Sequence, residues 1–304
     1  MHVGILSARS GWHTDQLRRA LAERGHTCVL APYESIVARI ASHSGSRLQF
    51  LPTDSGSRTE PAPGDSRSPD AVLARIIPNG SLEQIIFRVD ALHWLEDRGV
   101  RVVNPPRAIE RTVDKFYTSA LLQDAGLPTP ETVVCEDFPT AMAAVREMGD
   151  VIVKPIFGSM GHGMVRISDP EIGFRILRPL EQCGAIFYVQ RAIDHGGADI
   201  RAFVAGRQVI AAIERRAPDG DWRTNVSRGA SARAIDLCDR YQQYAVDAAT
   251  AVGADYAGVD LLPSRDGEVY VLEVNGIPGW RGLQQATGVD VAGAICDLLE
   301  QPAR

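Results

Sequence analysis

The sequence predicts an open α/β domain at the N-terminus followed by two α+β subdomains, and three observations lead to this fold class. The first part of the chain alternates short apolar strands with amphipathic helices, as parallel sheets do. From residue 131 onward short strands dominate and few helices interrupt them, which is typical of antiparallel sheets. With 304 residues, the chain is long enough for two or three subdomains with cores of their own.

The first elements follow from apolar periodicity and from stop signals. A strand over residues 2–6 leads to a helix over about residues 14–24, which Gly25 ends, and then to a strand over residues 27–31. The turn after the first strand contains no GxGxxG pattern, so a dinucleotide site is not indicated. Residues 52–70 are rich in Pro, Ser, Gly and Asp and predict an exposed loop.

The remaining elements of the first domain begin after this loop with a strand over residues 71–77. Ser81 and Gln84 form a capping-box pattern that opens a helix, and Gly99 closes it. A strand over residues 100–103 and helices over residues 107–111 and 114–125 are expected to follow.

The second part of the chain is predicted from β-rich runs separated by helix signals. The expected strands cover residues 132–135, 151–155, 164–167, 185–190, 200–204 and 208–214. The expected helices lie near residues 139–148, 170–180 and 237–252. A hairpin of two apolar strands is expected near the C-terminus, with its turn at residues 265–267.

Composition excludes several classes of protein. The chain is 45% hydrophobic and 23% charged, which is ordinary for a soluble globular protein. Its net charge of -6 gives no electrostatic reason to expect a nucleic acid or a membrane as partner. The five cysteines lie singly, without the spacing of a zinc or redox site, and are expected to be reduced thiols. Neither a signal peptide nor a long apolar run is visible, so a cytoplasmic location is expected.

The segment VIVKPIFGSMGHGMVRI places Lys154 at the end of an apolar strand, ahead of Gly158, Gly161 and Gly163. Two strands joined by a glycine-rich loop can lay backbone N–H groups over phosphates, because glycine lets the main chain come close. This arrangement differs from a P-loop, in which the lysine follows the glycines and a helix comes next. The alternative is a flexible hairpin with a solvated lysine.

The segment YAGVDLLPSRDGEVYVLEVNGIPGW carries polar residues among apolar ones. Glu273 and Asn275 are two apart and so share a face of their strand, and Asp260 on the partner strand falls roughly opposite. Three oxygen donors on one face suit a divalent cation such as Mg2+ that also holds substrate phosphates. The alternative is a solvated sheet face or a capped turn.

Arginines cluster between these two segments. Arg201 and Arg215 lie in apolar strand context, where a guanidinium could clamp a carboxylate or a transferring phosphoryl group. Arg207 and Arg216 are interpreted as surface residues that form salt bridges. Isolated histidines such as His13 receive no role, and no covalent nucleophile is indicated.

Several motifs together resemble the RimK-like ATP-grasp ligases: DK at 114–115, KPxxGSxGxGM at 154–164, DIR at 199–201, AAIERRA at 211–217, WRTN at 222–225, AGVDLL at 257–262 and LEVNGIPG at 272–279. The resemblance runs from about residue 71 to the end. It implies an N-terminal open α/β (pre-ATP-grasp) domain over residues 1–110. A central subdomain over residues 111–187 and a C-terminal one over residues 188–304 would then sandwich ATP.

The same resemblance implies roles for individual residues. Those implied to contact the nucleotide are Lys115, Lys154, Gly158, Ser159, Gly161 and Gly163, with Gln190, Arg191, Ala192 and Ile193 as the adenine hinge and Asp199 at the ribose. Arg223 and Asn225 would line the phosphate and metal side, and Asp260, Glu273 and Asn275 would hold Mg2+. Relatives often have Glu where this chain has Arg191, and the loop over residues 52–70 has no clear counterpart.

The function that follows is an ATP-dependent carboxylate–amine ligase. It would add an amino acid, expected to be L-glutamate, to a small pterin or furan cofactor through an acyl phosphate, releasing ADP and phosphate. Arg201 and Arg215 are expected to be catalytic, ATP and Mg2+ to be required, Mn2+ to substitute, and a homo-oligomer to form. One alternative is glutamate ligation to a protein C-terminus or amino-group carrier protein, and another is a non-catalytic ATP-binding regulator. The identity of the acceptor, the amino acid and the number of additions stay open.

Overall fold

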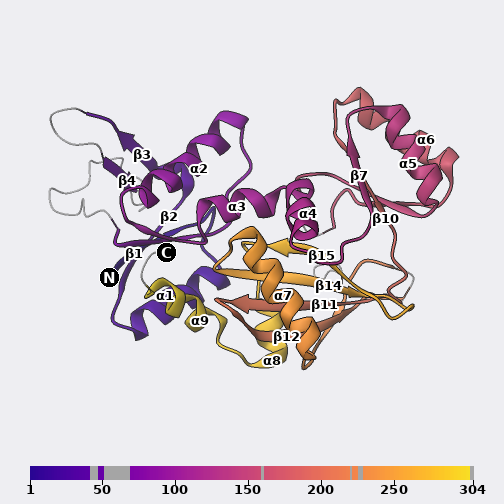
Figure 1. Ribbon diagram of the computed structural model, residues 1–304. Coiled ribbons are helices and arrows are strands. Elements are labelled where there is room, and N and C mark those ends of the chain that lie inside the picture. The colour runs from indigo at the N-terminus through magenta and orange to yellow at the C-terminus, as the bar shows by residue number, and fades with distance from the viewer. Residues whose placement is uncertain (42–46, 51–68, 159–160, 220, 225–228, 302–304) are drawn as a thin grey trace.

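The computed structural model describes residues 1–41, 47–50, 69–158, 161–219, 221–224 and 229–301. Within these residues the strands form three larger sheets and one small hairpin. Figure 1 shows the N-terminal sheet at one end of the molecule, a second sheet with α5 and α6 at the other end, and the third sheet with α7 between and below them. The N-terminus and the helix over residues 291–299 both lie beside the N-terminal sheet.

The N-terminal sheet has the strand order β2-β1-β5-β6, and each neighbouring pair is parallel, as the alternating strand–helix pattern predicts. Its strands are β1 (His2–Leu6), β2 (Thr27–Ala31), β5 (Ala71–Ala74) and β6 (Arg101–Val103). The helices of this region are α1 (Trp12–Glu23), η1 (Tyr33–Ser35), α2 (Leu82–Glu96) and α3 (Pro106–Val113). A small hairpin joins β3 (Ile36–Arg39) to β4 (Arg47–Phe50).

Two details differ from the sequence expectation in this region. The strand expected over residues 71–77 ends at Ala74, because its neighbours β1 and β6 end there as well: Leu6 pairs with Ala74, and Val103 pairs with Leu73. Of the expected loop over residues 52–70, only Pro69 and Asp70 belong to the described residues. Pro69 is buried, and the Asp70 carboxylate accepts a hydrogen bond from the His2 N–H, so this end of the loop is held against the sheet.

The second sheet has the order β7-β10-β8-β9 and is antiparallel throughout. Its strands are β7 (Thr132–Cys135), β8 (Val151–Lys154), β9 (Val165–Ile167) and β10 (Phe187–Arg191). Helices α5 (Phe138–Met148) and α6 (Pro170–Gln182) cover one face and share an apolar core with it. Helix α4 (Lys115–Asp124) leads into this sheet and packs against β15 (Val269–Asn275) of the third sheet, so it connects the two.

The third sheet has the order β13-β12-β11-β14-β15 and is also antiparallel. Its strands are β11 (Ala198–Ala205), β12 (Gln208–Arg216), β13 (Ser231–Ala234), β14 (Tyr256–Pro263) and β15 (Val269–Asn275). Helix α7 (Asp239–Val252) packs on one face, where its alanines meet Val259 and Val274. On the opposite face, Phe203 and Ile213 share an apolar core with Val3 and Ile5 of the N-terminal sheet.

The C-terminal helices α8 (Arg281–Thr287) and α9 (Val291–Leu299) return to the beginning of the chain. Ile295 and Leu298 of α9 lie in one apolar cluster with Leu17 and Leu21 of α1. Burial of such side chains is worth roughly 1.5–3 kcal/mol each, so the first and last segments stabilise one another. Within the described residues, every helix is too short or too polar to cross a membrane.

Candidate active site

The glycine-rich loop leaves β8 at Lys154 and returns as β9, which pairs antiparallel to β8. This is the strand–loop–strand arrangement that the sequence predicts. Gly158, Gly161 and Gly163 all have positive φ, at 144°, 69° and 73°, which side chains other than glycine rarely adopt. Ser159 lies outside the described residues. The loop therefore depends on its glycines for backbone shape, whichever ligand it covers.

Lys154 is buried, and its Nζ donates to Gln190 Oε1 at 2.5 Å. The Gln190 amide in turn donates to Thr132 Oγ1 at 2.9 Å and to Tyr188 Oη at 3.1 Å. Burial lowers the pKa of Lys154 to about 8, while the charges of Glu273 and Asp260 act in the opposite direction. A cation whose bonded partner is neutral, close to two carboxylates of another sheet, is suited to meet phosphate oxygens.

Lys115 lies in the first turn of α4, whose N-terminus Asp114 caps by accepting a hydrogen bond from the Tyr117 N–H. Its Nζ donates to the carbonyl oxygens of Ile156 and Gly158 at 3.1 and 2.8 Å. Burial lowers the pKa of Lys115, and the negative charge of Glu273 opposes this shift only in part. Lys115 thus holds the start of the glycine-rich loop, near the same carboxylate that acts on Lys154.

The hairpin of β14 and β15 places the three expected metal ligands together. Asp260 pairs directly with Glu273, and Gly258 pairs with Asn275, so the predicted alternation is correct. Asp260 is buried, and Asn275 Oδ1 accepts a hydrogen bond from the Ile277 N–H at 3.0 Å. The part of the chain that the structure describes holds no group of three or more His, Cys, Asp or Glu side chains fit for a metal. Any cation here would rely on two carboxylates, one amide and its substrate.

The two arginines that the sequence singles out both bind Asp260. Arg201 on β11 makes a bidentate ion pair with the Asp260 carboxylate, and Arg215 on β12 approaches it at 2.9 Å. Arg215 also forms a bidentate pair with Asp199, which accepts a further bond from Thr224 Oγ1. The result is a row of alternating charges, Asp199, Arg215, Asp260 and Arg201, of which the first three are buried and Arg201 is partly exposed.

The charges in this row shift one another's pKa. Desolvation opposes ionisation of Asp260, but Arg201 and Arg215 outweigh it and hold its pKa below the usual range. Desolvation, with a contribution from Asp260, raises the pKa of Asp199, which shares one arginine. Burial lowers the pKa of Arg215, yet the two carboxylates raise it overall. Asp260 is therefore the more firmly ionised of the two carboxylates.

The expected adenine hinge follows β10. The N–H groups of Arg191 and Ala192 donate to Glu131 O at 2.8 Å and Asp150 O at 2.9 Å. The Arg191 side chain turns to an ion pair with Glu131 and to Met148 O. A nucleotide base at Gln190, Arg191, Ala192 and Ile193 would have to use the remaining backbone groups, because these two N–H groups already have partners.

Arg223 pairs with a carboxylate that lies outside the ion row. Its guanidinium donates to the Asp221 carboxylate at 2.9 and 3.1 Å and lies 5.7 Å from the Trp222 ring centre. Asn225, the other residue expected on the phosphate side, lies outside the described residues. Arg207 and Arg216 are exposed, as the sequence interpretation holds.

Sequence reasoning missed Tyr188, and it assigned Gln190 to the adenine hinge without its bond to Lys154. Tyr188 and Gln190 are two apart on β10 and so share one face, and Tyr188 pairs with Lys154 on the neighbouring strand. Tyr188 Oη also lies 2.8 Å from Ser119 Oγ on α4. A Tyr and a Gln on one face of an apolar strand were the available signal, but their partner is set by strand pairing that local sequence does not reveal.

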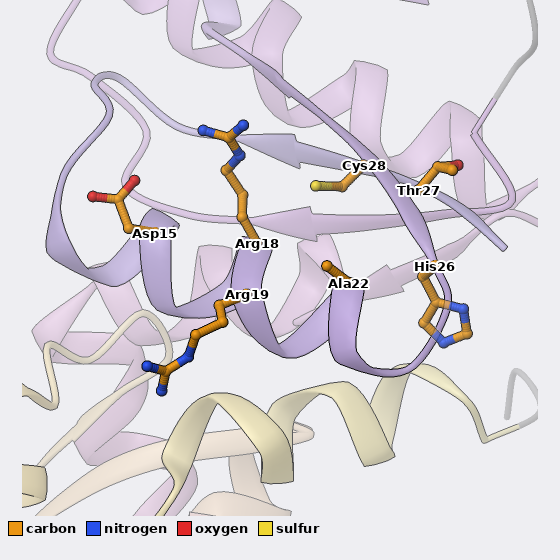
Figure 2. A pocket seen from close by; sticks show the side chains of 7 residues that line it. All are labelled: Asp15, Arg18, Arg19, Ala22, His26, Thr27 and Cys28. Atoms are coloured by element: carbon orange, nitrogen blue, oxygen red, sulfur yellow. The ribbon is translucent and has the colours of Figure 1, made fainter.

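A separate depression lies between α1 and β2, with a volume of about 540 Å3 (Figure 2). Its lining residues are Asp15, Arg18, Arg19, Ala22, His26, Thr27 and Cys28. None of them belongs to the expected site, and His26 is already bonded to Glu300. This surface hollow is therefore separate from the candidate active site.

Comparison with known proteins adds to this geometry. The RimK-like ATP-grasp domain matches residues 112–299. The tetrahydromethanopterin:alpha-L-glutamate ligase of Methanosarcina acetivorans is 36% identical in an alignment 258 positions long, which covers 76% of this chain and 80% of that protein. The probable alpha-L-glutamate ligase of Trichodesmium erythraeum is 32% identical in an alignment 305 positions long, which covers 99% of this chain and 96% of that protein.

A solved structure is similar over nearly the whole chain. The ATP-grasp ligase PsnB, complexed with a phosphomimetic variant of minimal precursor, Mg and ADP, superposes with a TM-score of 0.72 at 24% identity. The match covers 98% of this chain and 97% of that one. At this identity the likeness shows a shared fold.

Proposed function

The chain belongs to the RimK-like ATP-grasp family, and on that premise we propose that it uses ATP to join L-glutamate to a carboxylate of a small cofactor-like acceptor. Its relatives are named ligases, and the family forms C–N bonds, so the chain is an ATP-grasp ligase. The proposal includes ATP bound between the units over residues 111–187 and 188–304, beside an N-terminal unit over residues 1–110.

The observation that carries the proposal is the buried Lys154. Its ammonium lies in a low-dielectric site whose bonded partner, Gln190, is neutral, and burial depresses its pKa to about 8. Such a group gains most from an anionic ligand, because an unpaired buried charge is costly. Lys115 and the glycine-rich loop lie beside it and would complete a phosphate site with backbone N–H groups.

The residues present fit a divalent cation. Asp260, Glu273 and the Asn275 amide supply oxygen ligands on one sheet face, which is the chemistry that Mg2+ prefers. Asp260 is firmly ionised and would share its oxygens between the cation and the arginines. A bound Mg2+ would neutralise charge on the phosphates of ATP.

The reaction would then proceed in two steps. An oxygen of the acceptor carboxylate attacks the γ-phosphorus of ATP, the bond from that phosphorus to the β,γ-bridging oxygen breaks, and ADP leaves. The amine nitrogen of glutamate next attacks the acyl carbon, loses a proton, and displaces phosphate. Arg201 and Arg215 would stabilise negative charge on the acyl phosphate and on its tetrahedral successor, because guanidinium groups bind such oxygens bidentately.

The acceptor is the finer part of the proposal. The relative from Methanosarcina acetivorans is named for tetrahydromethanopterin, which favours a pterin or related cofactor here. PsnB was also solved with the precursor peptide PsnA2, so a peptide or protein carboxylate is the second candidate. Product formation with a small carboxylate, in the absence of any peptide or protein acceptor, would support the cofactor as the acceptor.

The experiment is a measurement of ADP and phosphate release with Mg-ATP across amino acids and carboxylate acceptors, with mass spectrometry of the products. The acceptors include pterin and furan cofactor precursors and peptides with a free C-terminus. ADP formed only when both partners are present, with an adduct one glutamyl unit heavier, is the expected result. AMP as product would overturn the acyl-phosphate route, and tight ATP binding without turnover would favour a regulatory protein.

A further inference from the structure

The segment 276–280 directly follows Asn275, and the N-terminal domain holds it from three places. His13 lies in the first turn of α1, after β1, whereas Arg75 and Asn104 follow β5 and β6 directly. All three therefore lie at the carboxyl ends of strands in the same parallel sheet. Each bonds to the backbone of the segment, at every second residue.

The first contact is made by Asn104, which is fully buried. Its Nδ2 donates to the carbonyl oxygens of Gly276 and Tyr256, and its Oδ1 accepts from the N–H groups of Asp255 and Tyr256 at 2.7 and 3.0 Å. Both donors and both acceptor positions of the amide are thus used. Only an amide of this size can satisfy all four backbone groups.

The second contact is made by Arg75, which is 3% exposed. Its Nη2 donates to Pro278 O at 3.0 Å and its Nη1 to Tyr256 Oη at 2.9 Å, and the guanidinium lies 4.6 Å from the Trp280 ring centre. Within the described residues, no carboxylate lies at ion-pair distance from Arg75. A buried cation with neutral partners lowers the stability of the fold. We therefore look for the role of Arg75 in the segment that it orders.

The third contact is made by His13, whose Nε2 accepts the Trp280 N–H at 3.1 Å. The imidazole lies edge-on to the rings of Trp12 and Trp280, with ring centres 5.0 and 4.6 Å away. Burial, with the nearby charges of Arg75 and Arg281, lowers the pKa of His13 to about 4. The ring is therefore neutral at ordinary pH, as an accepting nitrogen requires.

The segment in turn touches the proposed metal and arginine site. The Ile277 N–H donates to Asn275 Oδ1, so the backbone course of the segment sets the orientation of that amide. Pro278 packs against Gly258, where an added Cβ would lie 3.0 Å from Pro278 Cβ and 3.1 Å from Arg201 Nη1. A shift of the segment would disturb Asn275 and the space beside Arg201 together.

We propose that His13, Arg75 and Asn104 are positioning residues, through which the N-terminal domain holds segment 276–280 and thereby orients Asn275 for the divalent cation. The inference rests on the proposed function, because it requires Asn275 to be a metal ligand. None of the three residues touches the reacting atoms.

The test is calorimetric binding of ADP with and without Mg2+, comparing wild type with Arg75→Met. Partners that orient a metal ligand typically change metal affinity tenfold to a hundredfold. The variant should therefore need roughly tenfold or more Mg2+ to reach the wild-type gain in ADP affinity. ADP affinity without Mg2+ should stay equal, because Lys154 bonds to Gln190 and Lys115 bonds to the glycine-rich loop, and these groups are not partners of Arg75.

Arg24→Gln is the matched control. Arg24 also joins the first domain to the C-terminal part of the chain, through Gly293 O and Asp297, but it lies away from segment 276–280. Its removal should lower the melting temperature and leave the Mg2+ requirement unchanged. His13→Gln keeps a hydrogen-bond acceptor for the Trp280 N–H, so its Mg2+ requirement should stay closer to that of wild type than the requirement of His13→Phe. Neither of these variants removes the buried charge of Arg75.

Hydrogen exchange of the peptide containing Trp280 provides a readout independent of ligands. The Trp280 amide should exchange faster in Arg75→Met and His13→Phe than in wild type and Arg24→Gln. A full Mg2+ effect in Arg75→Met together with unchanged exchange would overturn the inference and leave the proposed ligase intact. A wild-type protein whose ADP affinity does not respond to Mg2+ would instead overturn the proposed metal site, and this inference with it.

Discussion

Lys154 and Gln190 form a buried hydrogen bond of 2.5 Å between an ammonium and a neutral amide oxygen. The bond leaves the charge of Lys154 without full compensation, and burial places its pKa at about 8, below the ordinary 10.5. The charged form of Lys154 therefore destabilises the folded, ligand-free protein. This destabilisation can be measured as a dependence of the free energy of unfolding on pH.

The folded pKa of Lys154 is depressed, so the cost of burying its charge is fully present below pH 8 and disappears above pH 10.5. A shift of this size corresponds to about 3 kcal/mol. Lys154→Met should be the more stable protein near pH 7.5, and its advantage over wild type should shrink by up to about 3 kcal/mol toward pH 10.5. Urea unfolding across this range measures the difference, and an advantage that stays constant would speak against the buried charge.

Arg201→Ala should lower turnover by roughly a hundredfold or more, because one preorganised partner of the acyl phosphate is lost. Arg216→Ala is the control on the neighbouring element, since Arg216 is exposed and pairs only loosely with Glu214 at 3.5 Å. Steady-state rates with the true substrates and circular dichroism of both variants provide the measurement. Near-normal turnover of Arg201→Ala would remove this residue from the proposed mechanism.

Glu273→Gln should raise the Mg2+ concentration needed for half-maximal activity roughly tenfold or more, because a neutral amide is a weaker ligand for a hard cation. Glu268→Gln is the control, because Glu268 lies in the same hairpin outside the expected site and its carboxylate is 3.8 Å from the Arg240 guanidinium on the surface. It should keep the wild-type Mg2+ requirement. Titration of activity with Mg2+, and with Mn2+ as the expected substitute, distinguishes the two variants.

Arg191→Ala should leave the KM for ATP within about threefold of wild type, since exposed ion pairs contribute little and the Arg191 guanidinium points to Glu131 and Met148. Adenine would be held by backbone, which the substitution retains. A KM raised more than tenfold would show that the side chain itself reaches the nucleotide.

Much of the fold and site was predictable because the relevant groups are close in sequence. Gly158, Gly161 and Gly163 lie between two strands that pair with each other, so their loop could be recognised locally. Asp260 and Glu273 share one hairpin, and its short turn limits the register, so their opposition followed from strand alternation. The polar strand β13 was missed because its side chains lie largely exposed, and pairing with β12 alone makes it a strand.

The residue types of the candidate site, which are the glycine-rich loop, the carboxylates and the arginines, can therefore be recognised in the sequence alone. How they combine depends on the order of the strands, because β11 lies between β12 and β14 and brings Arg201 and Arg215 to the same carboxylate. The same holds for His13, Arg75 and Asn104, whose partners lie more than a hundred and fifty residues away. Contacts between distant segments depend on sheet order and burial, which local periodicity does not encode.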